Sequence, residues 1–283
     1  MLRINLEKEL YKLLLQIPEG KITTYKELAI ALGDEIAARA VARMLARNKH
    51  PDKYPCYKVV KSDGSIGGYS LGVEEKLRRL RKEGIRVKNG KVLEFERLVF
   101  RDFKSSAPLK KLREEQVKIA RLARSSAIKL PEKPVVAGVD ASYANGEAIA
   151  CAVVLNESKE VIEEKHVKAK VSFPYIPTYF AYRELPLLLK AIKKLKVKPD
   201  VVMVDGNGML HPRFCGIATH LGMLLRLATI GVAKRLLTGE LKGDRIFIGK
   251  RVVGKVVRIN GKRFYISPGS FIDLKGAMKI VKR

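Results

Sequence analysis

The amino-acid sequence predicts an α/β protein of two domains: a small N-terminal domain of the winged-helix, helix-turn-helix type and a larger C-terminal domain built on a mixed β-sheet. The chain has 283 residues, which exceeds the usual length of one domain. Short helical patterns separated by turns fill the first hundred residues. In the remainder, three strand-like runs are followed by alternating strand and helix patterns, which is typical of an α/β sheet with mixed pairing.

The composition is that of a basic globular protein. Lys and Arg number 57 against 29 Asp and Glu, a net charge of +28, which favours a polyanionic partner such as nucleic acid or an acidic membrane surface. No apolar run approaches the roughly 20 residues of a membrane span, and the N-terminus lacks the apolar core of a signal peptide. The three cysteines (Cys56, Cys151 and Cys215) are too few and scattered for a disulfide framework or a zinc knuckle. We therefore expect a soluble, cytoplasmic protein with free thiols.

The first domain begins with three helical patterns. Residues 5–17 carry apolar side chains at helical spacing, and a second helix is predicted to start at Thr23 or Thr24. A third helix is predicted within residues 35–48. It carries Arg39, Arg43 and Arg47. This outline indicates a helix-turn-helix, although the spacing fits a small helical bundle with a solvated basic face equally well.

The rest of the first domain is predicted to contain a wing and a helix. Residues 61–72 are rich in glycine and predict a hairpin or wing, and a charged helix over residues 73–84 ends at Gly84. The segment that follows, around residues 101–110, has the composition of a linker. The predicted bounds are 1–98 for the first domain, 99–107 for the linker and 108–283 for the second domain.

The second domain opens with a basic helix over residues 109–128 and an apolar run at 134–143 that suggests a buried strand. Further elements follow in a regular order. They are strands at 148–156 and 161–173, a helix through 179–195, a strand at 200–208, a helix around 215–228, a strand at 229–234, and a closing hairpin of 251–259 with 262–269.

Cys56 is the first candidate for chemistry. It follows Pro55, which stiffens the backbone, and lies near the candidate DNA-reading helix. A thiol becomes a useful nucleophile when a neighbour favours its thiolate, but a free cysteine is most often a small buried hydrophobe. The residues alone leave both interpretations open.

Residues 18–84 resemble the C-terminal domain of the O6-alkylguanine-DNA alkyltransferases. The matching motifs are, in order, GKITTYKELA, ARAVARMLARN, PCYKVV, SDGSIGGYSLG and LRKEG. The resemblance implies that a damaged guanine is flipped out of double-stranded DNA and that its alkyl group moves irreversibly to the cysteine, without a cofactor.

The same resemblance implies roles for single residues. Cys56 would be the alkyl acceptor, and Arg39 would fill the gap that the flipped base leaves in the stack. Tyr25 would help the phosphate to rotate and the leaving group to gain its proton. Asn48 would order the turn before the cysteine, and Glu83 would anchor a proton relay.

The sequence departs from this family directly after the cysteine. The family usually has His and Arg there, whereas this chain has Tyr57 and Lys58. The histidine relays a proton through water, and tyrosine, with an ordinary pKa of about 10, is a poor base at neutral pH. We interpret Tyr57 as an unusual activator because Cys56 is retained; the alternative is a non-catalytic sensor of alkyl lesions.

Three carboxylates form the second candidate site. Asp140 and Asp205 each end an apolar strand pattern, and Glu184 lies on the helix between them. Carboxylates at strand ends can converge at one edge of a sheet, where they form a hard oxygen site that suits Mg²⁺ and the attack of water on a phosphodiester. The alternative for each acidic residue is an ordinary turn or helix cap.

Residues 108–283 resemble endonuclease V. The motifs are GVDASY, FPYIPTYFAYRE, VMVDGNGMLHPRFCGIATHLG and IGVAKRLL. The resemblance implies an RNase H-like fold that nicks DNA one nucleotide beyond deoxyinosine on its 3′ side, with Mg²⁺ or, in its place, Mn²⁺. It implies Asp140, Glu184 and Asp205 as metal ligands, and Lys234 as the group that stabilises charge at the phosphate.

The resemblance also implies DNA contacts. Residues 174–177, PYIP, would form a stiff wedge that presents Tyr175 for stacking where the flipped base departed. Gly206 and Gly208 would let the backbone approach that base. His211, assigned here to DNA binding, and His220 are interpreted as structural or DNA-contacting residues rather than ligands, since Mg²⁺ prefers oxygen.

This half also departs from its family. A histidine near the metal site commonly follows the late strand, and Ser270 stands in its place. Asp273 or a water molecule could substitute for it.

Taken together, the two resemblances predict a bifunctional DNA-repair protein. We expect it to act as a monomer on double-stranded DNA with alkylated or deaminated bases, and not at a membrane. Two alternatives stay open: a first half that only senses lesions, and a nuclease that also acts on inosine in RNA.

Overall fold

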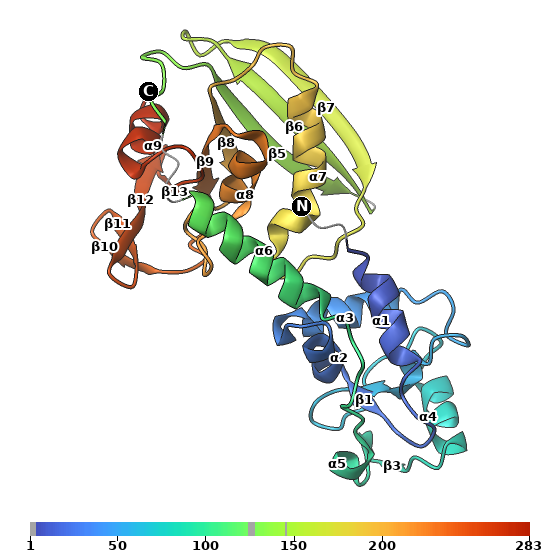
Figure 1. The fold of residues 1–283 in the computed structure, drawn as a ribbon. Helices are drawn as coiled ribbons and strands as arrows, with labels where there is room; N and C mark the ends of the chain where they lie inside the picture. Colours follow the sequence, from blue (N-terminus) through green and yellow to red (C-terminus); the bar gives the residue numbers. More distant parts are fainter. Residues whose placement is uncertain (1–3, 124–127, 145) are drawn as a thin grey trace. The chain divides into compact units, whose positions relative to one another are not determined.

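The computed structural model describes residues 4–123, 128–144 and 146–283. The chain divides into two compact units. The first consists of residues 1–113 with 173–177, and the second of residues 114–172 with 178–283. The predicted fold class is confirmed, with a small, mainly helical first unit and a second unit that holds a nine-stranded mixed sheet (Figure 1).

The first unit contains short helices, two pairs of two-residue strands and two 3₁₀ turns. Its elements are α1 (Leu6–Leu14), β1 (Thr23–Thr24), α2 (Tyr25–Ala31), a 3₁₀ turn (Glu35–Ala37), α3 (Ala38–Ala46), a 3₁₀ turn (Cys56–Lys58), β2 (Val59–Val60), α4 (Val73–Lys82), β3 (Val87–Lys88), β4 (Lys91–Val92) and α5 (Phe95–Leu98). Helix α6 (Pro108–Ala123) follows.

The helix starts follow from side-chain caps. The Asn5 side chain accepts a hydrogen bond from the Lys8 amide at the start of α1, and Thr24, rather than Thr23, caps α2 by accepting from the Glu27 amide. Such caps satisfy amides that have no partner within the helix. In the predicted third helix the first turn is 3₁₀, so the α-helical part begins only at Ala38.

The hairpin predicted within residues 61–72 lies elsewhere in the chain, at residues 87–92. Residues 61–72 form turns and coil, and the hairpin is instead β3–β4, closed by Asn89 and Gly90, which both have positive φ. An Asn-Gly pair is the turn that a two-residue hairpin favours. The glycine-rich segment runs beside it, with the Ile66 amide donating to the Gly90 carbonyl. The wing therefore combines both segments.

The segment predicted as a linker has no regular structure, but it packs against the first unit. The Phe100 amide donates to the Ile22 carbonyl. The Gln16 side chain donates to the Lys104 carbonyl and accepts from the Lys104 amide, at 2.9 and 2.8 Å. Hydrogen bonds at Phe100 and at Lys104 thereby hold both ends of residues 100–104.

The second unit is a sheet in the order β10-β11-β12-β13-β9-β8-β5-β6-β7. Strand β5 pairs in parallel with β8, and β8 with β9, whereas the other neighbours are antiparallel. The bounds are β5 (Val136–Ala144), β6 (Glu147–Leu155), β7 (Val161–Lys170), α7 (Phe180–Lys193), β8 (Val201–Asp205), α8 (Ile217–Leu225), β9 (Ala228–Ala233), β10 (Glu240–Lys242), β11 (Arg245–Ile248), β12 (Arg251–Ile259), β13 (Lys262–Pro268) and α9 (Leu274–Val281).

The two faces of the sheet differ. On one face, Val139 and Val204 pack with α7 and α8 in a core that contains Leu185 and Leu221 (Figure 1). On the other face, α9 packs against β8, β9 and β13. Because side chains alternate along a strand, Asp140 and Asp205 point to the face of α9 and not to that of Val139 and Val204.

Several elements were not predicted. Strands β10 and β11 and helix α9 are absent from the sequence-based order because their apolar patterns are short. The predicted helix over 109–128 corresponds to α6, and its residues 124–127 lie outside the described part of the chain. Within the described residues, no helix is long and apolar enough to cross a membrane.

Candidate functional site

Cys56 lies in a 3₁₀ turn directly before β2, and its side chain is buried. The Asn48 Nδ2 group is 3.1 Å from both the Cys56 Sγ and the Tyr54 carbonyl oxygen, while its Oδ1 accepts from the His50 amide. One amide side chain thus fixes the loop before the cysteine and donates to the sulfur.

The environment keeps the Cys56 thiol protonated. Burial raises the pKa of the thiol, and the hydrogen bond from Asn48 and the charges of Lys76 and Arg79 lower it only in part. A reaction at this sulfur therefore needs a path for its proton.

Glu83 gathers three donors beside the cysteine turn. The Tyr57 hydroxyl donates to its Oε1 at 2.5 Å, and the Gly20 amide and Lys58 Nζ lie 2.9 and 2.8 Å from its Oε2. Burial, and then the bond to Glu83, raise the pKa of Tyr57 far above its usual value. Tyr57 is therefore a neutral hydrogen-bond donor to Glu83 and not a base in its own right.

Lys76 is a residue of this site that the sequence analysis missed. Its side chain is fully buried, with Nζ 2.6 Å from the Val59 carbonyl and 2.5 Å from the Ile66 carbonyl. Burial lowers the pKa of Lys76 to about 8. The signal was present, since Lys76 lies one helical turn before buried Leu80 on α4.

The two predicted DNA contacts of this unit have different surroundings. Tyr25 is the first residue of α2, half-buried, and its pKa is raised by burial and then by the neighbouring Cys56. Arg39 is exposed on α3, on the same helical stripe as Arg43 and Arg47. The structure thus brings Tyr25, Asn48 and Cys56 together and leaves Arg39 at the surface.

In the second unit, two predicted carboxylates meet on neighbouring parallel strands. Asp205 is the last residue of β8, as predicted, whereas Asp140 lies in the middle of β5, because β5 continues to Ala144 by pairing with β6. Asp140 and Asp205 each come one residue after a paired position, Val139 opposite Val204. Burial raises the pKa of Asp140, and so does Asp205. Lys234, just after β9, forms an ion pair with Asp205.

Glu184 approaches this pair from α7. Its side chain is 3% exposed, and Tyr143 Oη donates to its Oε1 at 2.7 Å. Burial, with smaller contributions from Asp140 and Asp205, raises the pKa of Glu184 to about 7. The sequence analysis missed Tyr143, which lies three residues after Asp140 and so points to the opposite face of the sheet, toward α7.

These residues fit a hard divalent cation. All three carboxylates offer oxygen, and the pKa values of both Asp140 and Glu184 are raised by burial first and by their acidic neighbours second. The positive charge of Lys234 already pairs with Asp205. Bringing in a dication would relieve the remaining repulsion, as expected for a Mg²⁺ or Mn²⁺ site.

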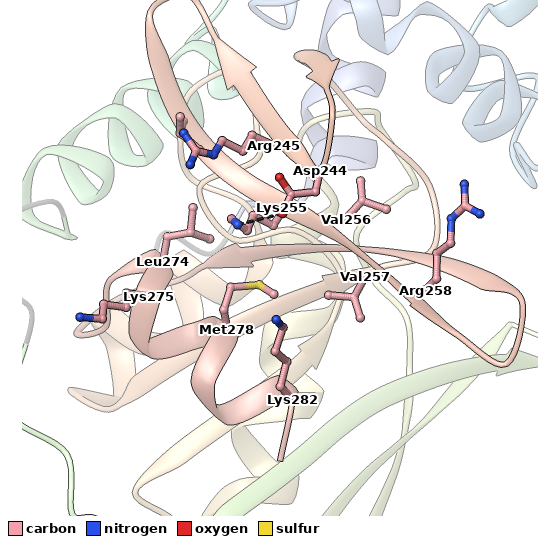
Figure 2. Close-up of a pocket in the computed structure, with 11 residues that line it drawn as sticks. Asp244, Arg245, Lys255, Val256, Val257, Arg258, Leu274, Lys275, Met278 and Lys282 are labelled. Carbon is pink, nitrogen blue, oxygen red and sulfur yellow. Dashed lines mark hydrogen bonds and ion pairs between the residues drawn. The ribbon is translucent and has the colours of Figure 1, made fainter.

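Two cavities of the second unit carry charged side chains that bear on its function. One, of about 390 Å³, is lined by Asp140, Asp205 and Lys234 together with Cys151 and Phe264. The other, of about 630 Å³, lies between β11, β12 and α9 (Figure 2). Its floor is apolar, and its cationic residues are Arg245, Lys255, Arg258, Lys275 and Lys282. Only Lys255 among them has a described acidic partner, Asp244 at 2.8 Å.

Gly206 and Gly208 are required by the packing of the second unit itself. A Cβ on Gly206, which has a φ of 148°, would lie 2.5 Å from Ile217 Cγ2, and one on Gly208 would lie 2.2 Å from the Pro268 carbonyl oxygen. Both positions therefore require glycine for packing, whatever else approaches them.

The two histidines of this segment are buried and neutral. His211 Nδ1 accepts from the Arg213 amide, so Nε2 donates to the Thr178 carbonyl at 3.0 Å. Burial lowers the pKa of His211 to about 3 and that of His220 to about 4. This geometry favours the structural role that the sequence analysis left open for both, over a direct DNA contact by His211.

Tyr175 is half exposed, with 51% of its surface accessible. Ser270, in contrast, is fully buried: its hydroxyl donates to the Thr219 carbonyl and its amide to Thr229. Asp273 caps α9 by accepting from the Gly276 amide. Neither Ser270 nor Asp273 lines the cavity that contains Asp140 and Asp205. Their described contacts therefore do not put either residue in the position near the metal site where the family has a histidine.

The fold and the two sites define a nucleic-acid-processing protein with an RNase H-like nuclease unit and a separate thiol-bearing unit. The family profile described as endonuclease V matches residues 117–283, and the one described as the DNA-binding domain of 6-O-methylguanine DNA methyltransferase matches residues 5–85. The chain belongs to the endonuclease V family and carries this methyltransferase domain at its N-terminal end.

Relatives share both halves. The chain is 44% identical to a bifunctional methyltransferase/endonuclease of Picrophilus torridus, over 100% of this chain and 91% of that protein. It is 43% identical to the Thermoplasma volcanium protein of the same name, over 97% and 83%. A structure of Ciona intestinalis endonuclease V in complex with DNA containing an inosine followed by a ribo-adenosine has a TM-score of 0.53 and 28% identity, over 61% of this chain and 89% of that one.

Proposed function

We propose that this protein repairs two kinds of DNA damage. The first unit moves an alkyl group from O6-alkylguanine to Cys56, and the second nicks DNA on the 3′ side of deoxyinosine. Support comes from relatives named bifunctional methyltransferase/endonuclease that align with nearly the whole chain. Those names favour transfer over the alternative in which the first half only senses lesions.

The observation that carries the transferase is the Asn48 bond to Cys56 beside the Tyr57–Glu83 pair. In the proposed step, Sγ attacks the alkyl carbon while the bond from that carbon to O6 breaks. The thiol proton leaves through water to Tyr57, which passes its own hydroxyl proton to Glu83, and Tyr25 protonates the departing guanine. Tyr57 thus relays a proton without becoming a stable tyrosinate.

The observation that carries the nuclease is the meeting of Asp140 in β5 and Asp205 at the end of β8, with Glu184 next to them. These three carboxylates would hold Mg²⁺, or Mn²⁺ in its place. When bound, the ion would activate water and neutralise charge on the scissile phosphate. Lys234 would hold its positive charge at the same phosphate, and Tyr143 would keep Glu184 oriented.

Double-stranded DNA is the proposed partner of both units. Arg39 would fill the stack at the alkylated base, and Tyr175 would fill it at the deaminated base. Gly206 and Gly208 would let the backbone approach that base, and His211 would support this segment from within. The cationic cavity of Figure 2 would hold backbone phosphates. We further propose a cytoplasmic monomer with domains at 1–98 and 108–283 joined by the linker 99–107, in keeping with its free cysteines.

Two assays test the proposal on the full chain. Duplex DNA with O6-methylguanine should add one methylene to the mass of the protein, and Cys56→Ala should abolish the gain. Duplex DNA with deoxyinosine should be nicked in Mg²⁺, and Asp140→Asn should abolish the nick. Binding of methylated DNA without a gain in mass would restore the sensor interpretation. Faster cutting of matched inosine RNA would reassign the nuclease substrate.

A further inference from the structure

Strand pairing places three different metal-ligating side chains together on the sheet. Cys151 of β6 lies opposite His166 of β7, and Val153 lies opposite Glu164. Positions two apart on a strand share a face, so Cys151, Glu164 and His166 all point to the same side. It is the side away from α7, because the neighbouring Val167 is buried in the α7 core.

The three ligand atoms lie close to the separations that a shared metal ion requires. The Cys151 Sγ is 3.5 Å and the His166 Nε2 is 3.0 Å from the same oxygen, Glu164 Oε1. All three atoms lie within 4.8 Å of one another. With bonds of about 2.3 Å to sulfur and about 2.0 Å to nitrogen and oxygen, a tetrahedral Zn²⁺ needs ligand separations of about 3.3 to 3.5 Å. Small side-chain rotations would reach that geometry.

We propose that Cys151, Glu164 and His166 bind Zn²⁺. Thiolate and imidazole suit a borderline-soft ion, whereas Mg²⁺ prefers oxygen. Glu164 and His166 are exposed and Cys151 is half-buried, so the site is open to water, which would complete a tetrahedron as fourth ligand. This inference does not depend on either activity proposed above.

The same pairing sets the zinc site beside the carboxylates. Cys151 is paired with Asp140 across β5 and β6, and it lines the cavity that holds Asp140, Asp205 and Lys234. Two metal sites with different donors would then be neighbours, with Cys151 directly opposite Asp140 on the adjacent strand. Hard ions would select the carboxylates and Zn²⁺ the sulfur-containing set, with Asp140 and Cys151 at the boundary.

Binding requires the Cys151 thiol to release its proton. The affinity for Zn²⁺ should therefore rise with pH, because the metal displaces a proton that the free protein holds.

Co²⁺ is a suitable probe because a cobalt–thiolate bond gives a near-ultraviolet charge-transfer band. The metal-free full chain is titrated with Co²⁺, and Zn²⁺ is then added in competition. We expect one equivalent of Co²⁺ to produce the band, Zn²⁺ to abolish it, and a large excess of Mg²⁺ to leave it. Cys151→Ser should remove the band, and His166→Asn should weaken Co²⁺ binding by at least the roughly 10- to 100-fold that loss of an outer-shell partner costs.

The matched control is Cys56→Ser, which removes a thiol from the first unit and should keep the band. His166 is a surface residue with 60% of its side chain exposed, so its replacement tests binding without endangering the fold. The proposal is overturned if the unaltered chain gives no band, if Cys56→Ser rather than Cys151→Ser removes it, or if His166→Asn leaves the affinity unchanged. Retained nicking of deoxyinosine DNA in Mg²⁺ would not rescue it.

Discussion

The hydroxyl of Tyr57 donates a 2.5 Å hydrogen bond to Glu83, in the position from which a proton would leave the cysteine turn. Both groups are held: the carboxylate by Gly20 and Lys58, and the phenol by burial that raises its pKa. Tyrosine can act here only as a relay, because it keeps its own proton at all physiological pH values.

Replacing Tyr57 tests this relay. Tyr57→Phe removes the hydroxyl, and we expect single-turnover alkyl transfer to slow by about 100-fold, the lower end of what acid–base groups contribute. Tyr57→His, which can accept a proton near neutral pH, should match or exceed the original rate. Quenched-flow transfer from methylated duplex gives both rates; equal rates for Phe and Tyr would remove Tyr57 from the mechanism.

Asn48 should set the pH dependence of transfer. Its hydrogen bond lowers a Cys56 pKa that burial raises, so the rate should climb as pH rises above neutral and more thiolate forms. Asn48→Ala removes a stabiliser of the thiolate, and its pH–rate profile should shift to higher pH. An unshifted profile with a uniformly lower rate would show that Asn48 only orders the loop.

Arg39 should matter only when a base must leave a duplex. We expect Arg39→Ala to lower the transfer rate from methylated duplex DNA by at least tenfold, since unstacking a base costs a few kcal/mol. Transfer from the free O6-alkylguanine base should be unchanged, because nothing is flipped. Arg47→Ala, on the same exposed stripe, is the matched control; a loss with the free base as well would point to a disturbed fold.

Glu184 makes the metal-free nuclease unit sensitive to pH. Its pKa is raised to about 7 in the folded state from an ordinary value of 4.5, so the folded state holds more protons between these pH values. The protonated Glu184 side chain therefore favours the folded state fully below pH 4.5, and this contribution to the free energy of unfolding is lost as pH rises through 7. Glu184→Gln should therefore raise the unfolding free energy on the order of 3 kcal/mol at pH 8 and little at pH 5.

Urea unfolding in chelator, at pH 5 and pH 8, measures this difference. The same variant should not nick deoxyinosine DNA. A Glu184→Gln protein that is less stable at both pH values would mean that the carboxylate is ionised and well satisfied without metal.

Lys234 should contribute charge to catalysis rather than stability. Lys234→Ala is expected to slow single-turnover nicking by about 100-fold, as for other groups that stabilise transition-state charge, with an unchanged unfolding midpoint. Its side chain is 68% exposed, which explains the small structural effect. Lys133→Ala removes a similarly exposed lysine that pairs with Glu157, and it should nick at the original rate.

The cationic cavity of Figure 2 should contribute to DNA affinity through salt-dependent contacts. Replacing Lys275 and Lys282 by Gln should weaken binding to duplexes of any sequence and reduce the slope of log K against log salt by about 0.9 per lost phosphate contact. Lys190 and Lys193 on α7 are exposed lysines for a matched double variant. Equal slopes for both doubles would exclude this cavity from the DNA path.

The sequence predicted what depends on local pattern. The strands that carry Asp140 and Asp205, and the helix with Glu184, followed from apolar runs and period, although β5 continues past Asp140 to Ala144. The sequence could not predict contacts across the sheet, because the register between two strands depends on both strands and not on the pattern of either one alone. Tyr143 bonded to Glu184, and Cys151 between Asp140 and His166, emerge only once the strands are paired.

A similar limit explains the first unit. Asn48 and Cys56 are eight residues apart and share one loop, so their relation was within reach of a motif. Lys76 donates to carbonyls that lie eight to seventeen residues away in the chain, and lysine is seldom fully buried, so the sequence indicates only a charged helix there. The Asn89–Gly90 hairpin signal was overlooked beside a longer glycine-rich stretch.

The register of β5 with β8 also limits how this nuclease can change through evolution. Its two aspartates share a face only because each follows the paired Val139 and Val204 by one residue. Deleting or inserting a single residue in either strand would turn one aspartate into the apolar core and bring a valine to the surface. Such a protein can explore new substrates through point substitutions and through the lengths of its loops, whereas the lengths of these two strands are closed to variation.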